Sequence, residues 1–210
     1  MNLGDHVGDD PLLVHRNREA LGRALQWPSS PTWLQQCHSR NIIRSDASDS
    51  STIADAAWTP SVGSVCVVMT ADCLPLLLSS KDGKKVAAVH VGWRGLAAGI
   101  IEVAIAQMGS GGELMAWLGP AIGAEDYEID AQVRSKMLQA DPDATSAFVD
   151  TRAGHWNMDL YELARRRLRQ SGVRDIFGGH FCTYSDPEQF FSYRRDGVCG
   201  RMASLIWRES

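Results

Sequence analysis

The chain has 210 residues and a formal net charge of −4 at pH 7, and its 21 Lys and Arg residues are spread along the sequence. This length fits one domain with a sizeable core, and the lack of a basic block argues against binding to nucleic acid or an anionic membrane. No apolar run reaches the roughly 20 residues of a membrane helix, and no signal-peptide core is present, so we expect a cytoplasmic protein with small-molecule partners. Five cysteines without regular spacing argue against a disulfide framework.

The first part of the chain predicts one helix and one short strand. Asp10 and Pro11 are typical of a helix start, and apolar residues then recur at helical spacing over residues 12–25. After a turn at the prolines, Gln36 and His38 alternate with Cys37, as in a strand. These two side chains should therefore share a face.

The central part of the chain predicts three strands, over residues 64–69, 74–78 and 86–91. Cys73 follows the first of these strands, and His90 lies within the third. Strands followed by tight turns hold side chains rigidly, which favours a functional site at this position.

Helices and strands alternate through the rest of the chain. We expect helices over residues 96–108, 131–138 and 159–171, with Asp159 as an N-cap and Gly172 as a C-cap. We expect strands over residues 114–118, 190–195 and 202–207. The pattern predicts an α+β or mixed α/β fold in which helices cover the faces of the sheets.

Residue types near these strands indicate a metal site. His38, Cys73 and His90 come from three different segments, and two imidazoles with one thiolate form a set that leaves zinc an open fourth position. A metal-free alternative stays open, in which His90 activates Cys73 as a nucleophile and Asp72 or Asp55 orients the histidine. Zinc bound to the purified protein would favour the first interpretation.

The GWRG turn of residues 92–95 is a candidate anion site. It opens a helix, so its backbone N–H groups, at Gly92 and Trp93, and the side chain of Arg94 can hold a phosphate or a carboxylate. Trp93 either stacks on a base or packs in the core. Near the C-terminus, Arg194, Arg195 and Arg201 lie among aromatic residues, where one of them can support the site.

Several segments closely resemble motifs of the YfiH-like family, long called multicopper polyphenol oxidase or laccase-like. They are WLQQCHS, ADAAWT, TADCLPLLL, AAVHVGWRGLAAGIIE, LGPAIGAEDYEID and FFSYRRDGVCGRMASLIW. The resemblance covers nearly the whole chain. It implies a cytoplasmic enzyme with layered α/β/β/α architecture and mixed β-sheets, whose zinc ligands fall on His38, Cys73 and His90.

The resemblance also implies an activity. It points to phosphorolysis of the purine nucleosides adenosine, inosine, guanosine and methylthioadenosine, with phosphate as co-substrate and with adenosine deamination alongside. Alternatives implied by the family are a Cys–His hydrolase that edits peptidoglycan precursors and a copper-dependent polyphenol oxidase. Multicopper oxidation needs many histidine ligands, whereas the chain has 6 dispersed histidines. The oligomeric state is left open.

Three departures from the family pattern stand out. Residues 1–210 form a single domain that begins at the NLGDHVGDD motif, so the chain is expected to lack the usual N-terminal segment. Cys37 and Ser39 replace the usual valine and glycine around the first histidine, and Cys199 replaces a common threonine.

These residues lead to a mechanistic expectation. Zinc held by His38, Cys73 and His90 would orient the substrate while Arg94 and the turn amides bind phosphate. Asp72 and Glu128 are the candidates for moving protons in deamination. If Cys37 closed the fourth position, the chain would instead be a non-catalytic module stabilised by zinc.

Overall fold

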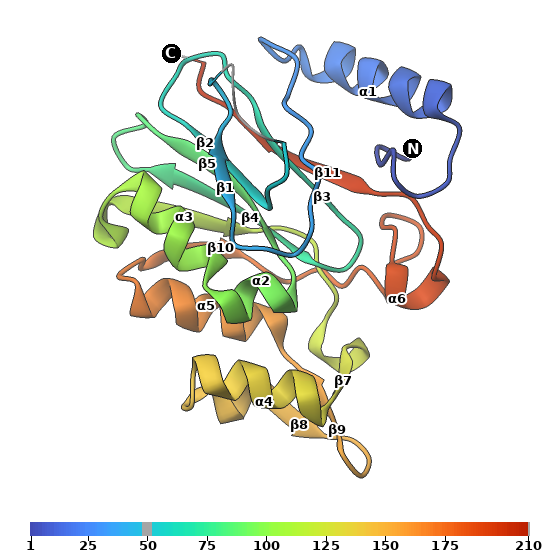
Figure 1. Cartoon of the computed structure of the whole chain (residues 1–210), viewed down its shortest axis with the longest axis vertical. Coiled ribbons are helices and arrows are strands. Elements are labelled where there is room, and N and C mark those ends of the chain that lie inside the picture. The colour runs from blue at the N-terminus through green and yellow to red at the C-terminus, as the bar shows by residue number, and fades with distance from the viewer. Residues whose placement is uncertain (48–51, 210) are drawn as a thin grey trace.

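The computed structural model of the chain describes residues 1–47 and 52–209 (Figure 1). The helices are α1 (Pro11–Leu25), α2 (Trp93–Ala98), α3 (Ile100–Met108), α4 (Ala131–Ala140), α5 (Leu160–Gln170) and α6 (Tyr193–Asp196). The strands are β1 (Ile42–Arg44), β2 (Ala56–Thr59), β3 (Cys66–Thr70), β4 (Leu74–Ser80), β5 (Val86–Val91), β6 (Leu114–Leu118), β7 (Glu128–Asp130), β8 (Phe148–Asp150), β9 (His155–Met158), β10 (Asp175–Gly178) and β11 (Met202–Ile206).

The main sheet has six strands in the order β1-β2-β5-β4-β6-β10. It is mixed, because β1 and β2 run parallel, as do β6 and β10, while β2, β5, β4 and β6 pair antiparallel. Every residue of β5 is buried. A strand buried on both faces requires a layer on each side of the sheet.

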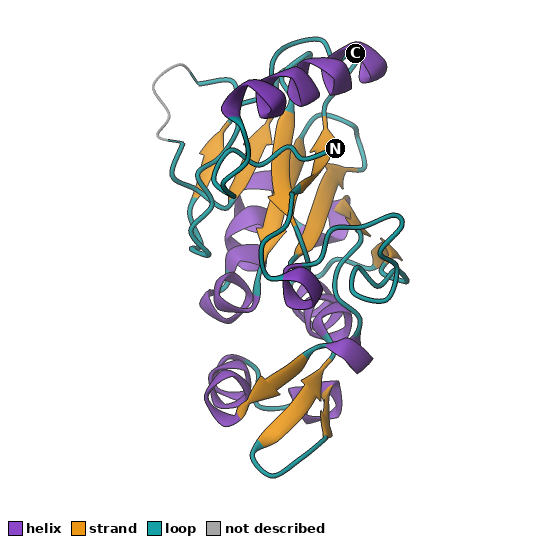
Figure 2. Cartoon of the chain, turned by 90° about the vertical axis from the view of Figure 1, so that its right-hand side faces the viewer, coloured by secondary structure: helices purple, strands orange, loops and turns teal. Residues whose placement is uncertain are grey.

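Helices cover one face of the main sheet, and a second sheet covers the other. Ala87, Val89 and Val91 of β5 belong to the core shared with α2, α3 and α5, whereas Ala88 packs with Cys66 of β3. Figures 1 and 2 show β3 and β11 between the main sheet and α1. The predicted α+β fold with layered mixed sheets is confirmed.

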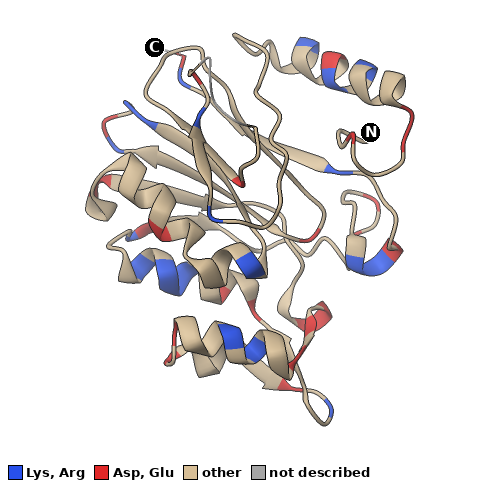
Figure 3. Ribbon diagram, viewed as in Figure 1, with Lys and Arg blue, Asp and Glu red and all other residues tan. Residues whose placement is uncertain are grey.

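A small lobe extends from the layered body at the bottom of Figure 1. It contains the three-stranded sheet β7-β9-β8 together with α4. Acidic and basic residues are interspersed over both parts of the molecule (Figure 3). None of the described helices is long and apolar enough to cross a membrane.

Two helices have the predicted N-caps. The side chain of Asp10 accepts a hydrogen bond from the backbone N–H of Leu12 at the start of α1. Asp159 caps α5 in the same way. Ser171, not Gly172, is the C-cap of α5, and Gly172 follows it with a φ of 89°.

Three local predictions are wrong. The expected helix over residues 96–108 is two helices, because Gly99 has a φ of 89° and interrupts the helical backbone. The expected strand over residues 190–195 is irregular in its first half and helical in its second half, where α6 begins. Ser192 caps this helix by accepting a hydrogen bond of 3.2 Å from the N–H of Arg195. The segment around His38 forms no strand, since this residue has a φ of 60°.

Candidate metal centre

The structure brings together the side chains of His38, Cys73 and His90. Their potential ligand atoms all lie within 4.8 Å of one another. Cys73 Sγ is 3.8 Å from His38 Nε2, and the two imidazole centroids are 4.9 Å apart. Among the described residues, this is the one group of three or more His, Cys, Asp and Glu side chains close enough to hold a metal ion.

Strand register explains how Cys73 and His90 meet. β4 pairs antiparallel with β5, with Leu74 opposite Val91 and Pro75 opposite His90. Cys73 directly precedes β4, so it lies beside the end of β5. In β5, His90 comes two residues after Ala88, so both side chains lie on the face of the sheet that is turned away from the helices.

Asp55, immediately before β2, connects the histidines. Its carboxylate accepts hydrogen bonds from the backbone N–H groups of Cys37 at 3.3 Å, His38 at 3.0 Å and Ser39 at 2.6 Å. It also accepts one from the Ser39 hydroxyl at 2.8 Å, and it lies 2.8 Å from His90 Nδ1. One buried carboxylate therefore shapes the loop that carries His38 and orients the ring of His90.

The charge of Asp55 sets the tautomer of His90. Burial would raise the pKa of Asp55, but hydrogen bonds from His90 and Ser39 outweigh it and hold the pKa well below its ordinary value. An ionised carboxylate only accepts hydrogen bonds, so His90 Nδ1 carries the proton. His90 Nε2 is then the atom that faces the centre, as in carboxylate–histidine–metal arrangements.

The thiol of Cys73 is acidified by its neighbours. Burial would raise its pKa, but the charge of His90 and hydrogen bonding with both histidines outweigh it and lower the pKa. For His90, burial would lower the pKa, but the charge of Cys73 and the hydrogen bond to Asp55 raise it. The thiolate is the form in which cysteine binds a metal or attacks an electrophile.

Gly92 has no side chain, and the space beside its Cα is filled by His38 and Cys73. A Cβ at this position would lie 2.7 Å from His38 Cδ2 and 3.1 Å from Cys73 Sγ. No other residue type fits there without displacing a donor. Gly92 is thus a packing requirement of the centre, in addition to any contact of its N–H with an anion.

The three donors lie in a cavity of about 530 Å³. Its wall carries aromatic rings and arginines and includes one carboxylate, that of Asp72. The remaining lining comes from β3 and from loops; the lining residues are His6, Gln36, His38, Met69, Thr70, Ala71, Asp72, Cys73, His90, Trp93, Arg94, Ile122, Tyr127, Tyr193, Arg194 and Arg201. A hollow with aromatic surface and positive charge suits an aromatic ligand together with an anion.

Two arginines of the wall are anchored to the backbone. Arg194 Nη1 donates to the carbonyl of Glu128 at 2.8 Å. Arg201 Nη1 donates to the carbonyls of Cys199 at 2.9 Å and of Gly200 at 3.1 Å. Fixing one nitrogen pre-organises each guanidinium. Arg195 instead bonds the carbonyls at positions 183, 184 and 190 and does not line the cavity.

The structure separates the two carboxylates considered for proton transfer. Asp72 lines the cavity with a φ of 90°, and its oxygens accept from Thr183 Oγ1 at 2.6 Å and from the N–H of Arg194 at 2.7 Å. Glu128 is directed to Arg152 and Thr151 and does not line the cavity. Only Asp72 is placed to act on a bound ligand.

Cys37 and Trp93 also differ in their placement. The Sγ of Cys37 lies 3.6 Å from Asp55 Oδ2, and this thiol is not part of the three-donor group. A closed site with Cys37 as fourth ligand is therefore not formed.

Trp93 is half-buried against the core, as one interpretation expected, and it also lines the cavity. Stacking of its ring on a base stays a prediction.

Two tyrosines of the cavity were missed by reasoning from the sequence. Tyr127 lies in the DYEID segment after a Gly-rich turn, and burial, with the charge of Cys73, raises its pKa. Tyr193 begins α6 and is 61% exposed. Both tyrosines lie in motifs that carry the family resemblance, and this is the one feature of the sequence that could have indicated a role in the site.

Comparison with known proteins identifies the family. A family model described as multi-copper polyphenol oxidoreductase laccase matches residues 1–209. The chain belongs to this family. It is 46% identical over 209 residues to purine nucleoside phosphorylase YfiH of Escherichia coli K12, a match that covers 99% of this chain and 86% of the relative.

Other members of the YfiH-like family agree. A purine nucleoside phosphorylase of Pseudomonas aeruginosa is 46% identical over 209 residues, covering 99% of this chain and 85% of the relative. A crystal structure of a Neisseria meningitidis DUF152 protein has a TM-score of 0.95 and 44% identity, covering 100% of this chain and 86% of that one. The predicted family membership is confirmed.

Proposed function

We propose that this chain is a zinc-dependent purine nucleoside phosphorylase that also deaminates adenosine. The observation that carries the proposal is the cavity: three soft donors at its base, with aromatic rings and arginines on its wall. The relatives named purine nucleoside phosphorylase support the same reaction.

The donor set fits zinc. Two imidazoles and one thiolate are ligands of catalytic zinc sites that keep an open position, and Asp55 supplies the outer hydrogen bond to a ligand histidine. When bound, zinc would supply Lewis acidity at the base of the cavity. Copper also accepts such donors, but oxidation by several coppers needs several sites, and the described residues contain one three-donor group.

In phosphorolysis, a phosphate oxygen bonds to C1′ of the ribose while the bond from C1′ to the purine nitrogen breaks. The purine leaves with the electron pair and gains a proton, and ribose 1-phosphate is the other product. Arg94, Arg194 and Arg201 provide positive charge for phosphate, together with the N–H groups of Gly92 and Trp93. The phenol of Tyr127 stays protonated and can donate a hydrogen bond to the base.

In deamination, water adds at C6 of adenosine and ammonia leaves, which gives inosine. Asp72 is the cavity carboxylate for the accompanying proton movement. Its hydrogen bonds with Thr183 and Arg194 keep it in place during that step.

The test is an adenosine assay on the purified protein with and without phosphate, with product analysis by chromatography. We expect adenine and ribose 1-phosphate only when phosphate is present, and inosine in both cases. Release of adenine at the same rate without phosphate would show hydrolysis and contradict phosphorolysis.

A second candidate is a metal-free Cys–His hydrolase. The observation in its favour is the sequence of contacts from Cys73 through the histidines to Asp55, which resembles a nucleophile, base and orienting carboxylate. Full activity in metal-free protein, with loss on alkylation of Cys73, would favour this candidate over zinc chemistry.

A further inference from the structure

A second groove adjoins the metal cavity between α2 and α4. It has a volume of about 550 Å³, and Trp93 and Arg94 line both the groove and the cavity. The other side of the groove is formed by α4, which belongs to the small lobe. A ligand in the cavity can therefore extend into the groove past Trp93.

The groove has positive charge without a balancing carboxylate. Lys136 of α4 and Arg94 of α2 line it, together with alanines and Gln139. Neither cation forms an ion pair or a side-chain hydrogen bond with any residue that the structure describes. Three other cavities have both acidic and basic residues in their linings.

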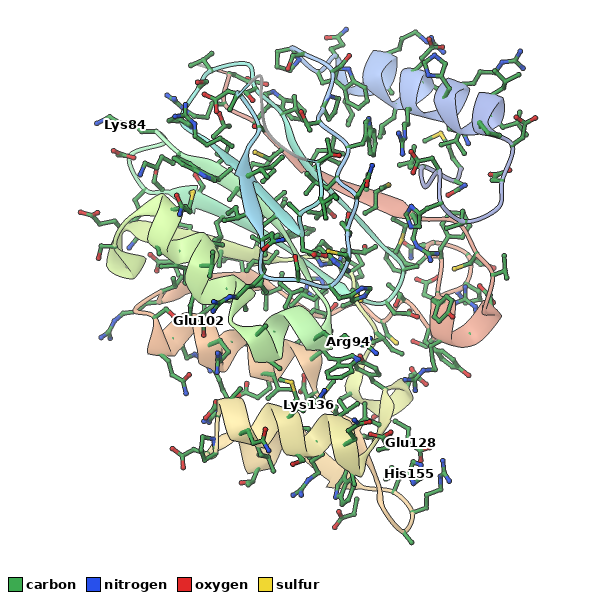
Figure 4. All side chains as sticks on the ribbon, in the orientation of Figure 1. Lys84, Arg94, Glu102, Glu128, Lys136 and His155 are labelled. Carbon is green, nitrogen blue, oxygen red and sulfur yellow. The ribbon has the colours of Figure 1, made fainter. Side chains whose placement is uncertain are left out.

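Both cations approach the same indole ring. The guanidinium carbon of Arg94 is 4.5 Å from the Trp93 ring centroid, and Lys136 Nζ is 5.7 Å from it. Figure 4 labels Lys136 on the side of α4 that faces α2, and Arg94 at the N-terminal end of α2. Both positive charges therefore lie against one ring of a groove whose lining contains no carboxylate, and both would attract an anion that binds there.

We propose that Arg94 and Lys136 form a phosphate-binding site at the junction of the metal cavity and the α2–α4 groove. The ligand is a phosphate dianion, either inorganic phosphate or the 5′-phosphate ester of a nucleoside whose base occupies the cavity. Arg94 offers a planar pair of donors, and Lys136 offers a mobile point charge. The inference rests on the proposed function for the location of the nucleoside.

The site makes the small lobe part of ligand recognition. Trp93 and Arg94 come from the layered body, whereas Lys136 lies more than forty residues further along the chain, on α4. Bound phosphate would connect these two parts of the molecule.

The test is calorimetric titration of the protein, with its metal, by inorganic phosphate and separately by adenosine 5′-monophosphate. The variants are Lys136→Glu, Lys136→Arg and, as a control with the same change in charge, Lys84→Glu. Lys84 lies in the turn after β4, where it pairs with Asp82 at 3.3 Å. We expect Lys136→Glu to weaken phosphate binding about tenfold, Lys136→Arg to retain it and Lys84→Glu to have no effect.

The two titrations distinguish inorganic phosphate from the phosphate ester of a nucleotide as the ligand of the site. Weaker binding of inorganic phosphate, with a matching rise in its KM, assigns the site to the co-substrate. Weaker binding of the nucleotide alone, with adenosine binding unchanged, assigns it to a phosphate ester. Equal affinities in Lys136→Glu and Lys84→Glu, or no binding of either ligand to the unmodified chain, would overturn the proposal.

The proposed phosphate site and the proposed phosphorolysis can be contradicted independently of each other. If Lys136→Glu loses phosphate affinity but the unmodified chain shows no phosphorolysis, the site stands and the proposed reaction fails. If phosphorolysis occurs with an unchanged KM for phosphate in Lys136→Glu, the reaction stands and the site fails.

Discussion

The base and the rim of the cavity are built in different ways. At the base, Asp55 is fully buried, His90 is 4% exposed, and hydrogen bonds hold both side chains. At the rim, Tyr193 is 61% exposed, and the exposed Arg94 lies over the ring of Trp93 without an ion pair to any described residue. The base is held by hydrogen bonds among its own residues, whereas the exposed side chains of Tyr193 and Arg94 can adjust to a ligand. Changes at the base should therefore affect the metal and every activity, and changes at the rim should affect substrate affinity.

The largest effect is expected for Cys73→Ala. Removing the thiolate leaves two imidazoles, so bound zinc should be lost and both activities should fall by more than about 100-fold, beyond what loss of an outer-shell contact costs. Metal analysis and the adenosine assay measure these losses. Cys66→Ala is the control, because Cys66 is buried on β3 away from the centre. Phosphorolysis retained in zinc-free Cys73→Ala would contradict the metal mechanism.

Asp55→Asn should have the next largest effect. The amide keeps the volume but loses the charge and one acceptor, so the loop that carries His38 and the tautomer of His90 are both disturbed. We expect the substitution to lower the affinity for zinc about 10- to 100-fold. Competition with a chelating dye measures this affinity. Asp46→Asn provides the control, since that carboxylate bonds Arg44 and Ser61 and does not line the cavity. Equal zinc affinities in the two variants would rule out the outer-shell role.

Gly92→Ala tests the packing at the base. Its Cβ would lie 2.7 Å from His38 Cδ2, and such overpacking costs about 1–3 kcal/mol. We expect weaker zinc binding and a lower melting temperature of the metal-free protein, because the clash with His38 is present with or without the metal. Gly112→Ala is a matched control, because the nearest atom to its Cβ is Ser110 Oγ at 4.0 Å. Unchanged zinc affinity in Gly92→Ala would show that the donors can shift freely.

Tyr193→Ala tests the rim. If this ring stacks on the base, its removal should raise the KM for the nucleoside about tenfold and leave the zinc content unchanged, since base–aromatic stacking contributes about 1–3 kcal/mol. Steady-state kinetics at saturating phosphate measure the change. Phe177→Ala removes another exposed ring outside the cavity and should leave KM unaltered. Loss of zinc in Tyr193→Ala would break the distinction between base and rim.

The smallest effect is expected for Glu128→Gln. The carboxylate accepts hydrogen bonds from Arg152 and Thr151 outside the cavity, so deamination should change less than about twofold. Asp72→Asn, in the same assay, should reduce deamination because Asp72 lines the cavity. A larger loss in Glu128→Gln than in Asp72→Asn would reverse this assignment of the proton-transferring group.

Part of the layered fold follows from the sequence, because apolar runs identify β4, β5 and β6 of the main sheet and both strands of the second sheet, and capping residues identify α1 and α5. The short strands β1, β2 and β10 and the three strands of the small lobe were not predicted. Local exceptions were missed. The break at Gly99 and the helix at Tyr193 depend on one backbone angle and one side-chain cap, which composition alone does not determine.

The candidate centre was partly predictable. Residue types and flanking strands indicate His38, Cys73 and His90, and the structure places them together. The multiple hydrogen bonds of Asp55 and the position of Tyr127 could not be derived, because they depend on contacts between segments far apart in the chain. The proposed role of Lys136 likewise depends on the packing of α4 beside α2.

The central claim is that the three donors hold a zinc ion on which nucleoside phosphorolysis depends. The most direct measurement is the rate of phosphate-dependent base release by protein stripped with a chelator and then reloaded with zinc, with metal content determined at each stage. We expect one zinc per chain, loss of the rate on stripping and recovery of the rate in proportion to the zinc restored. An undiminished rate in protein shown to be free of metal would contradict it.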